Sequence, residues 1–562
     1  MERKAKTQNS FMKNVVILMF SQVIIKIVGL IYKLYLTNKE GFGDKGNAIY
    51  SAGFQIYALL LTLCSIGVPN AISSLVSAKV AIGDNKGAHR IFKIAFAIFG
   101  FIGFICSCIL FFCAKNIACN YLEIPEAEMT LIALSPSIFI VSITSVLRGY
   151  FNGREKISVT ANSQSYEQVL KTILTIIIVE IISYVSVKNT VLMAAGATIA
   201  TTLSNVFSLL YLFTYYIKHK KEVWREVISS TVHKKESIGK IIKNILIICV
   251  PISLGALLSV TNKTIDAFTV VKIAKQFLGE EIATIQYGIL SGKVETLITL
   301  PFSFNIAFAT TLVPTIAASI AKNDMKTAKK RIEFSILLSI LIGLPCSAVM
   351  SVFAEPILKL LFPNAHEGAI MLQISSWSII FVVLIQTING ALQGLGKVNI
   401  PVVALGIGVV IKFILNILLV RIETIGVNGA IISSLASHMV TFIICFIYLI
   451  KCIDIRLKVD KMIIKPIIAT SAMVLLSYCI YNELNINLIM SLMIGVIIYG
   501  ISILILRILS KDELFMIPYG QKVYKLNEKR RKIKNYKNPV KSTFIAVDNC
   551  ETLEIKRFER KK

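Results

Sequence analysis

The chain has 562 residues, of which 55% are hydrophobic and 16% charged, with a mean hydropathy of +0.73 and a formal net charge of +28. Soluble globular chains carry about 25% charged residues, so this composition excludes an ordinary soluble domain. The positive charge does not indicate nucleic-acid binding, because the basic residues lie in short connections between apolar stretches and in the C-terminal tail. The eleven cysteines show no spacing typical of a zinc site or a redox pair.

Apolar stretches long enough to cross a bilayer core recur along the chain, which predicts an all-α polytopic membrane protein of about fourteen transmembrane helices. We predict spans at 14–36, 48–77, 90–113, 129–150, 159–186, 190–217, 241–270, 284–319, 330–353, 368–392, 399–421, 427–450, 464–482 and 486–508. The first follows a basic segment, as a signal peptide would, but no small-residue cleavage site comes after it. The fifth and sixth spans are separated only by a short turn at Lys188-Asn189.

Basic residues are concentrated in every second connection, such as the one that runs from Lys218 to Lys243. The alternate connections carry few, for example Lys39 and Lys45 after the first span. In short loops this asymmetry places the basic connections in the cytoplasm. We therefore expect a multi-pass protein of the cytoplasmic membrane with both termini inside the cell.

Landmarks of the first half recur in the second at a constant offset of 241 positions, as from Gly149 to Gly390. The same offset relates Gly153, Lys156 and Lys171–Val179 to Gly394, Lys397 and Lys412–Val420. Looser matches relate Gly196 to Gly429, Val68-Pro69 to Val313-Pro314, and Lys86-x-Ala88 to Lys326-x-Ala328. Such repetition predicts two pseudosymmetric copies of one multi-helix unit, a plan that is common among transporters.

The repeat and the longest connection define the expected organisation. We predict an N-terminal six-helix lobe at 1–217, a cytoplasmic inter-lobe loop at 218–240, a C-terminal six-helix lobe at 241–450, two extra helices at 451–510 and a basic cytoplasmic tail at 511–562. The tail fits either a segment bound to the anionic inner leaflet or a disordered solubilising end.

Several ionisable residues fall inside predicted spans, where they are costly and tend to face cavities. If the first, seventh and eighth spans adjoin, their lysines form a cationic patch that selects phosphate, diphosphate or carboxylate groups. The predicted substrate-binding residues are Lys26, Lys33, Lys263 and Lys293, with Asn262, Asp266, Glu295 and Thr296 as polar or charged partners. The alternative is that each lysine reaches the lipid headgroups on its own.

Spacing along single helices suggests two further pairings. Lys263 and Asp266 are three residues apart, and Glu167 and Lys171 are four apart, so each pair lies on one helix face. Lys171 and Lys412 occupy the same repeat position, and structural pairing is the role we expect for both.

Prolines interrupt several spans, and a proline inside a helix removes a backbone hydrogen bond and bends the helix. We expect kinks at Pro69, Pro301 and Pro314 to serve alternating access of the two lobes. We find no catalytic residues, no metal site and no cofactor motif. The stretch Gly390–Lys397 fails as a phosphate-binding loop, because Ala391 stands where its first glycine is required and Val398 follows the lysine. We therefore predict a transporter rather than an enzyme. Its energy would come from a gradient, the membrane potential or the substrate's own concentration difference, with a monovalent ion as a candidate coupling partner.

Six stretches taken together resemble the multidrug/oligosaccharidyl-lipid/polysaccharide exporter superfamily, and within it the stage V sporulation protein B group, relatives of the MurJ lipid II flippases. They are Gly46–Tyr57, Gly67–Ile72, Arg148–Gly153 with Glu167-Gln168, Tyr287–Pro301, Ala309–Pro314 and Leu392–Lys397.

The resemblance implies two six-helix lobes around a central cavity and two extra helices that hold a polyprenyl tail. The implied partners are a polyprenyl-diphosphate-linked glycan and membrane lipids, and the implied activity is outward movement of lipid II for cell-wall or spore-cortex peptidoglycan synthesis. The family's basic position on the first span is matched by Lys26, and its charged position on the eighth by Glu295. Many MurJ proteins carry arginine beside that glutamate, where this chain has Thr296, which leaves Lys293 as a candidate substitute.

Other functions remain open at this point. A flippase for another polyprenyl-linked polysaccharide unit would have the same charge pattern. A MATE-type drug or cation antiporter would favour acidic cavity residues, whereas lysines outnumber acids on the first, seventh and eighth spans. A membrane glycosyltransferase would need catalytic carboxylates on a large outer loop, and all predicted outer loops are short.

Overall fold

A computed structural model describes residues 27–186, 188–230, 236–321, 323–453, 459–510 and 513. Within these residues the protein is helical and contains no strand. The all-α membrane architecture expected from the sequence is thus confirmed.

The N-terminal lobe comprises a helix over residues 27–38 and six labelled α-helices. These are α2 (Gly43–Ser65), α3 (Gly67–Ala81), α4 (Asn85–Asn116), α5 (Glu128–Gly153), α6 (Ile157–Val185) and α7 (Thr190–Ile228), with short turns η1 (Ile117–Leu122) and η2 (Pro125–Ala127) before α5. The predicted break between the fifth and sixth spans is present, because Asn189 caps α7 by accepting hydrogen bonds from the amides of Val191 and Leu192.

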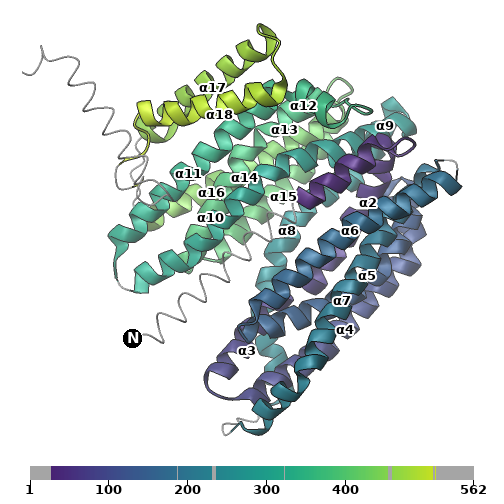
Figure 1. Cartoon of the computed structure of the whole chain (residues 1–562), viewed down its shortest axis with the longest axis vertical. Coiled ribbons are helices and arrows are strands. Elements are labelled where there is room, and N and C mark those ends of the chain that lie inside the picture. Colours follow the sequence, from purple (N-terminus) through teal and green to yellow (C-terminus); the bar gives the residue numbers. More distant parts are fainter. Residues whose placement is uncertain are drawn as a thin grey trace, which may run out of the picture. The chain divides into compact units, whose positions relative to one another are not determined.

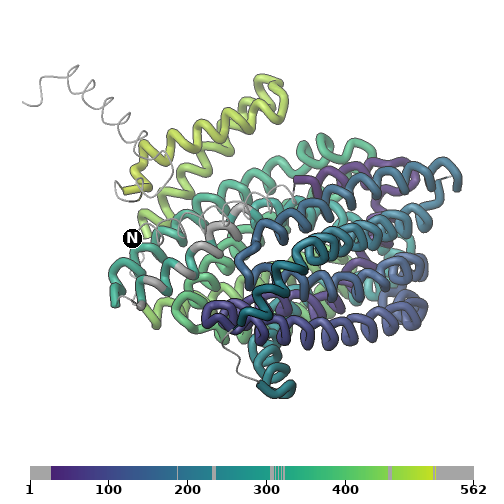
Figure 2. Tube along the Cα trace, turned by 60° about the horizontal axis from the view of Figure 1, so that its bottom comes forward, coloured from purple at the N-terminus to yellow at the C-terminus, as the bar shows by residue number. Residues whose placement is uncertain are grey.

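The C-terminal lobe repeats this order. It comprises α8 (Ile238–Leu278), α9 (Glu280–Gly288), the π-helical turn η3 (Ile289–Val294), α10 (Glu295–Ala321), α11 (Met325–Val352), α12 (Ala354–Leu361), α13 (Ala369–Ser376), α14 (Ser378–Gly394), α15 (Asn399–Val420) and α16 (Asn428–Ile453). Figure 1 shows α4 to α7 in one group and α10, α11, α14 and α16 in another, with α8 between them, and the groups stay distinct in Figure 2.

Twelve helices in the described part of the chain are long and apolar enough to cross a membrane. They coincide with twelve of the predicted spans. The first predicted span lies mostly outside the described residues, and the eighth is helical as α9, η3 and α10 without being among the twelve.

By internal contacts the chain divides into two compact units, Met1–Leu457 with Tyr478–Ser491, and Lys458–Ser477 with Leu492–Lys562. Both lobes belong to the first unit. The second holds η4 (Asp460–Ile464) and most of α17 (Lys465–Asn482) and α18 (Leu488–Ile505). Within it a Cβ at Gly495 would lie 2.1 Å from the Ser477 Oγ, so the two helices approach closely.

The repeated glycines mark the same helix contact in each lobe. A Cβ at Gly149 would lie 3.0 Å from the Pro69 carbonyl oxygen, and one at Gly390 would lie 2.7 Å from the Ala309 carbonyl oxygen. Gly153 and Gly394 likewise abut Val76 and Ile316. Glycine is required at these positions because α5 and α14 touch the backbone of the neighbouring helix.

These contacts correct one predicted match. They relate Pro69 to Ala309 at an offset of 240 positions, so the alignment of Val68-Pro69 with Val313-Pro314 is wrong. The repeat therefore does not relate Pro69 of α3 to Pro314 of α10. The match around Lys86 and Lys326 holds, because Asp84 and Asp324 both cap the following helix with a carboxylate oxygen.

Hydrogen bonds from Thr327 hold the pKa of the Asp324 carboxyl below its usual range.

The buried apolar side chains form three clusters that show how the lobes meet. One contains Val68, Phe92, Leu147 and their neighbours in the N-terminal lobe, together with Ile241 and Cys249 from the start of α8. A second, around Ile316 and Leu392, lies wholly in the C-terminal lobe. The third joins both lobes, since it includes Leu36, Ile49, Tyr287, Leu358 and Phe362. The lobes therefore share a core at the end predicted to face outward. At the opposite end the start of α8 packs on the N-terminal lobe, and apart from it the two lobes have separate cores.

We predict that Gly390→Ala destabilises the fold. The added methyl would meet the Ala309 backbone, and overpacking of this kind costs about 1–3 kcal/mol, so the thermal unfolding midpoint in detergent should fall. Gly100→Ala in α4 is the matched control, because a Cβ there has no heavy atom within 4 Å. Equal midpoints for the two variants would contradict the close-contact explanation.

Candidate functional site

Two adjoining cavities of about 350 and 320 Å³ lie within the two-lobed unit. Volumes of this size are typical of small-molecule sites. They share Lys263, Glu295 and Thr299, so α8 and α10 form the wall between them. We call them the C-lobe cavity and the N-lobe cavity, after the lobe that supplies most of the remaining lining.

The C-lobe cavity contains a buried ion pair between α8 and α15. The Lys412 Nζ lies 2.6 Å from the Asp266 Oδ2, and the Asn416 Nδ2 donates to the Asp266 Oδ1 at 2.8 Å. Lys412 is 2% exposed and Asp266 5%. Because both carboxylate oxygens have a donor, the pair is satisfied internally and adds no net charge to the cavity.

A second ion pair stands between the two cavities. The Lys263 Nζ lies 2.8 Å from the Glu295 Oε2, and the lysine side chain is 41% exposed. This pair is thus accessible from both sides and is weaker than a fully buried one, since water screens it.

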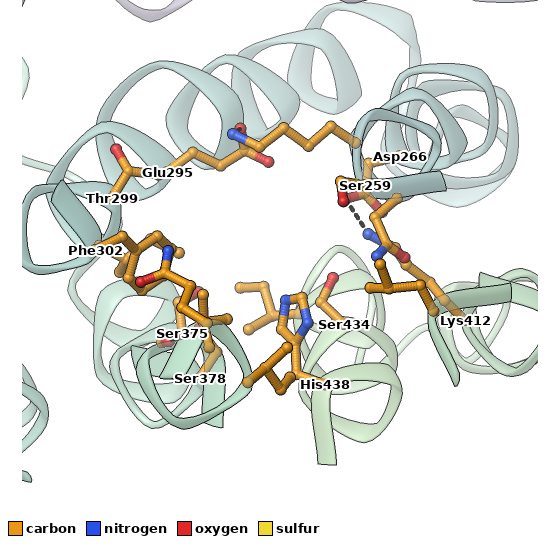
Figure 3. A pocket seen from close by; sticks show the side chains of 18 of the residues that line it. Ser259, Asp266, Glu295, Thr299, Phe302, Ser375, Ser378, Lys412, Ser434 and His438 are labelled. Carbon is orange, nitrogen blue, oxygen red and sulfur yellow. Dashed lines mark hydrogen bonds and ion pairs between the residues drawn. The ribbon is translucent and has the colours of Figure 1, made fainter. Parts of the chain in front are cut away.

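The rest of the C-lobe cavity is lined by apolar side chains, such as Ile298, Phe302 and Ile385, and by neutral polar groups, with Glu295 and His438 on opposite sides in Figure 3. The neutral polar groups are Ser259, Asn262, Ser375, Ser378, Gln386, Asn389, Ser434 and His438. The side-chain oxygens of Asn262 and Asn389 have no hydrogen-bond partner within the described structure, so both can accept a hydrogen bond from a ligand. The lining therefore combines apolar surface with a few neutral polar groups that can hydrogen-bond to a ligand.

The N-lobe cavity has a different electrostatic character. Lys33 places its Nζ 4.9 Å from the ring centre of Tyr50, and Lys171 places its Nζ 5.0 Å from the ring centres of Tyr32 and Phe54. Cations bind aromatic faces at such distances. Gln55, Gln168, Ser291 and Thr296 complete the polar part of the lining.

The structure places six of the eight predicted cavity residues in the two cavities. Lys33, Lys263, Glu295 and Thr296 line the N-lobe cavity, and Asn262 and Asp266 line the C-lobe cavity. Lys26 lies outside the described residues. Pro69 lies in the first turn of α3 and Pro301 in α10; Pro314 is also in α10, where its side chain is not described. The role of the prolines in alternating access stays a prediction.

Lys293 does not line either cavity, which corrects the prediction made for it. It is 0% exposed and donates to the Asp44 Oδ2 at 2.9 Å and to the Ala365 carbonyl oxygen at 2.6 Å. The reason is the π-helical turn η3, which carries Lys293 toward α2. Lys293 therefore joins the two lobes, and Asp44 supplies the countercharge.

Both pairings inferred from spacing along one helix are wrong. Lys263 pairs with Glu295 rather than with Asp266, and Glu167 pairs with Arg148 at 2.7 Å rather than with Lys171. In each case a partner on a neighbouring helix has better geometry than the residue one turn away. Lys171 and His438 are cavity residues that sequence reasoning missed. The repeat already set Lys171 apart, because it is the counterpart of Lys412.

Comparison with known proteins identifies the family to which this chain belongs. Residues 126–519 match the family described as lipid II flippase MurJ, and residues 18–177 match the MatE family. The chain belongs to the MurJ family. It is 24% identical to stage V sporulation protein B of Bacillus subtilis (strain 168), over 91% of this chain and 98% of that protein.

Other relatives agree with this assignment. The chain is 26% identical to lipid II flippase MurJ of the same organism, over 78% of this chain and 82% of that protein. Its fold resembles an inward-facing multidrug resistance MATE family transporter of the MOP superfamily, with a TM-score of 0.63 and 16% identity over 78% of this chain and 98% of the other. The chain is therefore a multi-span membrane transporter of the MOP superfamily rather than an enzyme, as the sequence predicted.

We predict that replacing Lys293 alone destabilises the protein more than replacing both Lys293 and Asp44. Lys293→Met leaves a carboxylate buried without its partner, which costs about 3–5 kcal/mol. The double variant Lys293→Met/Asp44→Asn should recover part of the lost thermal stability. Lys359→Met, which breaks the exposed pair with Glu355, is the control and should change little. A double variant no more stable than Lys293→Met would contradict this interpretation.

Proposed function

We propose that this chain is a flippase for lipid-linked glycans, and that its substrate is undecaprenyl-diphosphate-linked peptidoglycan precursor, lipid II. Membership of the MurJ family supports a flippase for a lipid-linked glycan. The observation that carries the proposal in this chain is the N-lobe cavity, where Lys33 and Lys171 present ammonium groups held by aromatic rings. Such groups recognise a phosphate-type anion through charge-assisted hydrogen bonds.

The two cavities suit the two chemical parts of such a headgroup. The cationic N-lobe cavity would receive the diphosphate, and the neutral polar lining of the C-lobe cavity would receive sugar hydroxyls and amides. A drug cation fits less well, because the two acids of the C-lobe cavity, Asp266 and Glu295, are each engaged by a lysine.

Transport would proceed by alternating access between the lobes. The lobes share a core at one end and, apart from the start of α8, have separate cores at the other. We therefore infer that the cavities open toward the end with separate cores. With both termini in the cytoplasm, as the basic residues predict, that end faces the side where the precursor is made. The extra helices α17 and α18 expose apolar side chains such as Leu475 and Val496, which would suit the prenyl tail. A monovalent ion as coupling partner stays part of the proposal.

The test is lipid II translocation in a bacterial strain whose own flippases can be depleted. The wild-type chain should restore outward-facing lipid II, while Lys33→Gln at equal protein level should reduce it roughly tenfold or more, because the variant removes one ammonium group from the anion site. Lys26→Ala tests the family-matched position in the same strain.

Lys115→Gln, at the end of α4 and away from both cavities, is the charge-matched control and should translocate normally. No rescue by a well-expressed wild type would reject lipid II as the substrate. Assays with other polyprenyl-linked glycans and with drugs would then decide between the remaining transporter functions.

A further inference from the structure

The last helix of the N-terminal lobe is longer than a membrane span requires. Helix α7 runs from Thr190 to Ile228 and has 39 residues, which at about 1.5 Å per residue gives a length of about 58 Å. A bilayer with its headgroups is about 40–45 Å thick, and an ordinary tilt of about 20° shortens the helix too little to remove the excess. The last turns of α7 therefore lie at or beyond the headgroups, on the side predicted to be cytoplasmic.

One face of this end of α7 is packed on the N-terminal lobe. Val223 and Val227 are buried, and the Trp224 ring lies edge-on to the His89 ring of α4, with 5.9 Å between the ring centres. Glu226 is paired with Arg154, which ends α5. These contacts to α4 and α5 determine the direction in which the other face of α7 points.

That other face exposes large apolar side chains. Ile217, Trp224 and Ile228 are 64%, 41% and 71% exposed, although they lie beyond the part of α7 that the bilayer core needs. Leu203 and Leu210 in the spanning part of α7 are also exposed, and the residues from Leu203 to Trp224 follow one another at intervals of seven. This spacing places them on one side of the helix. The exposed stripe is therefore continuous with one that a bilayer covers.

Lysines surround the exposed tryptophan. Lys220 and Lys221 precede Trp224 by four and three residues, so they are its neighbours on the helix surface. The Lys93 Nζ, from α4, lies 5.8 Å from the centre of the Trp224 ring. All three lysines are exposed, and none of them belongs to an ion pair in the part of the chain that the structure describes.

The acids of this segment do not neutralise the three lysines. Glu222 is two residues from Trp224, which puts it about 200° away around the helix, and Glu226 is engaged by Arg154. The face around Trp224 thus combines uncompensated positive charge with tryptophan and aliphatic side chains, a combination typical of helices that bind the membrane interface. An acidic soluble protein would complement the charge, but it would not explain why the apolar stripe continues from the spanning part of α7.

We propose that the cytoplasmic end of α7 is a binding site for anionic phospholipids. The three lysines bind the lipid phosphates, and Trp224 lies at the boundary between headgroups and acyl chains with the apolar stripe on either side of it. Phosphate groups supply the negative charge that the protein does not supply here. None of these residues lines either cavity, so the inference does not depend on which substrate the protein carries.

The test uses the fluorescence of Trp224 in the full-length chain. The chain contains two tryptophans, so Trp377→Phe leaves Trp224 as the only reporter. The protein is placed in phosphatidylcholine nanodiscs that contain an equal small fraction of lipid brominated near its headgroup, either phosphatidylglycerol or phosphatidylcholine. Bromine quenches tryptophan fluorescence on contact. We expect the anionic lipid to quench Trp224 at least about twofold more strongly, and added salt to reduce the difference.

A triple variant in the Trp377→Phe background tests the three lysines. Lys93→Gln/Lys220→Gln/Lys221→Gln should remove the preference for phosphatidylglycerol, because it removes the charges that face the lipid. A preference that survives this variant would overturn the assignment to these lysines. Trp224 fluorescence that neither brominated lipid quenches would overturn the site, and so would equal quenching by the two lipids.

Two controls accompany the test, and thermal unfolding midpoints show that each variant is folded. Trp224→Phe leaves only Trp377 and should show no comparable preference for phosphatidylglycerol. A second triple variant removes the same charge from exposed lysines at the predicted cytoplasmic end of the C-terminal lobe and should keep the preference; it is Lys326→Gln/Lys330→Gln/Lys397→Gln. Loss of the preference in this second variant would overturn the site, because net charge would then explain the result.

Discussion

The arrangement of this transporter depends on how each charge in its interior is neutralised. An uncompensated charge is expensive in a membrane-spanning helix bundle, where water is scarce and the effective dielectric constant is low. Four cationic side chains are neutralised by carboxylates of the protein itself. Lys412 binds Asp266, Lys293 binds Asp44, Arg148 binds Glu167 and Lys263 binds Glu295. Each pair joins two different helices, and the pairs of Lys412 and Lys293 join helices that are distant in sequence. Neutralising the charges therefore also influences which helices pack together.

Lys33 and Lys171 are stabilised differently from these four cations, because no described ion pair contains either lysine. Their ammonium groups lie over the rings of Tyr50, Tyr32 and Phe54. Ring faces reduce the cost of burying a cation, yet they leave a positive potential in the adjoining cavity. A two-fold repeat would by itself give two equivalent cavities. In this chain the two cavities differ in charge, because Lys412 is paired with a carboxylate whereas Lys171 lies beside aromatic rings.

The sequence predicted the helices well and the pairings poorly, for one physical reason. Helix length and apolarity are local properties, so spans such as 159–186 and 399–421 agree closely with α6 and α15. Pairing depends on contacts between helices, which the spacing of Lys263 and Asp266 on one helix could not reveal. Lys293 shows this most clearly, because a π-helical turn moved a residue expected in the cavity into the contact between lobes. Lys171 could have been found, since the repeat had already matched it to Lys412 and only the partner was unknown.

Lys33 and the contact between the lobes are connected by hydrogen bonds. The Thr37 hydroxyl donates to the Lys33 carbonyl oxygen at 2.9 Å, and the Asn47 amide donates to the Thr37 Oγ1 at 2.9 Å. Asn47 in turn packs on Gly292, one residue before Lys293, so closely that a Cβ at the glycine would lie 2.6 Å from the Asn47 Cβ. The alternating access proposed above would separate the lobes at this end and break the buried Lys293–Asp44 pair. The helix that carries Lys33 is hydrogen-bonded to Asn47, which packs at the contact between the lobes. A ligand that binds Lys33 would therefore contact a helix that moves when the lobes separate.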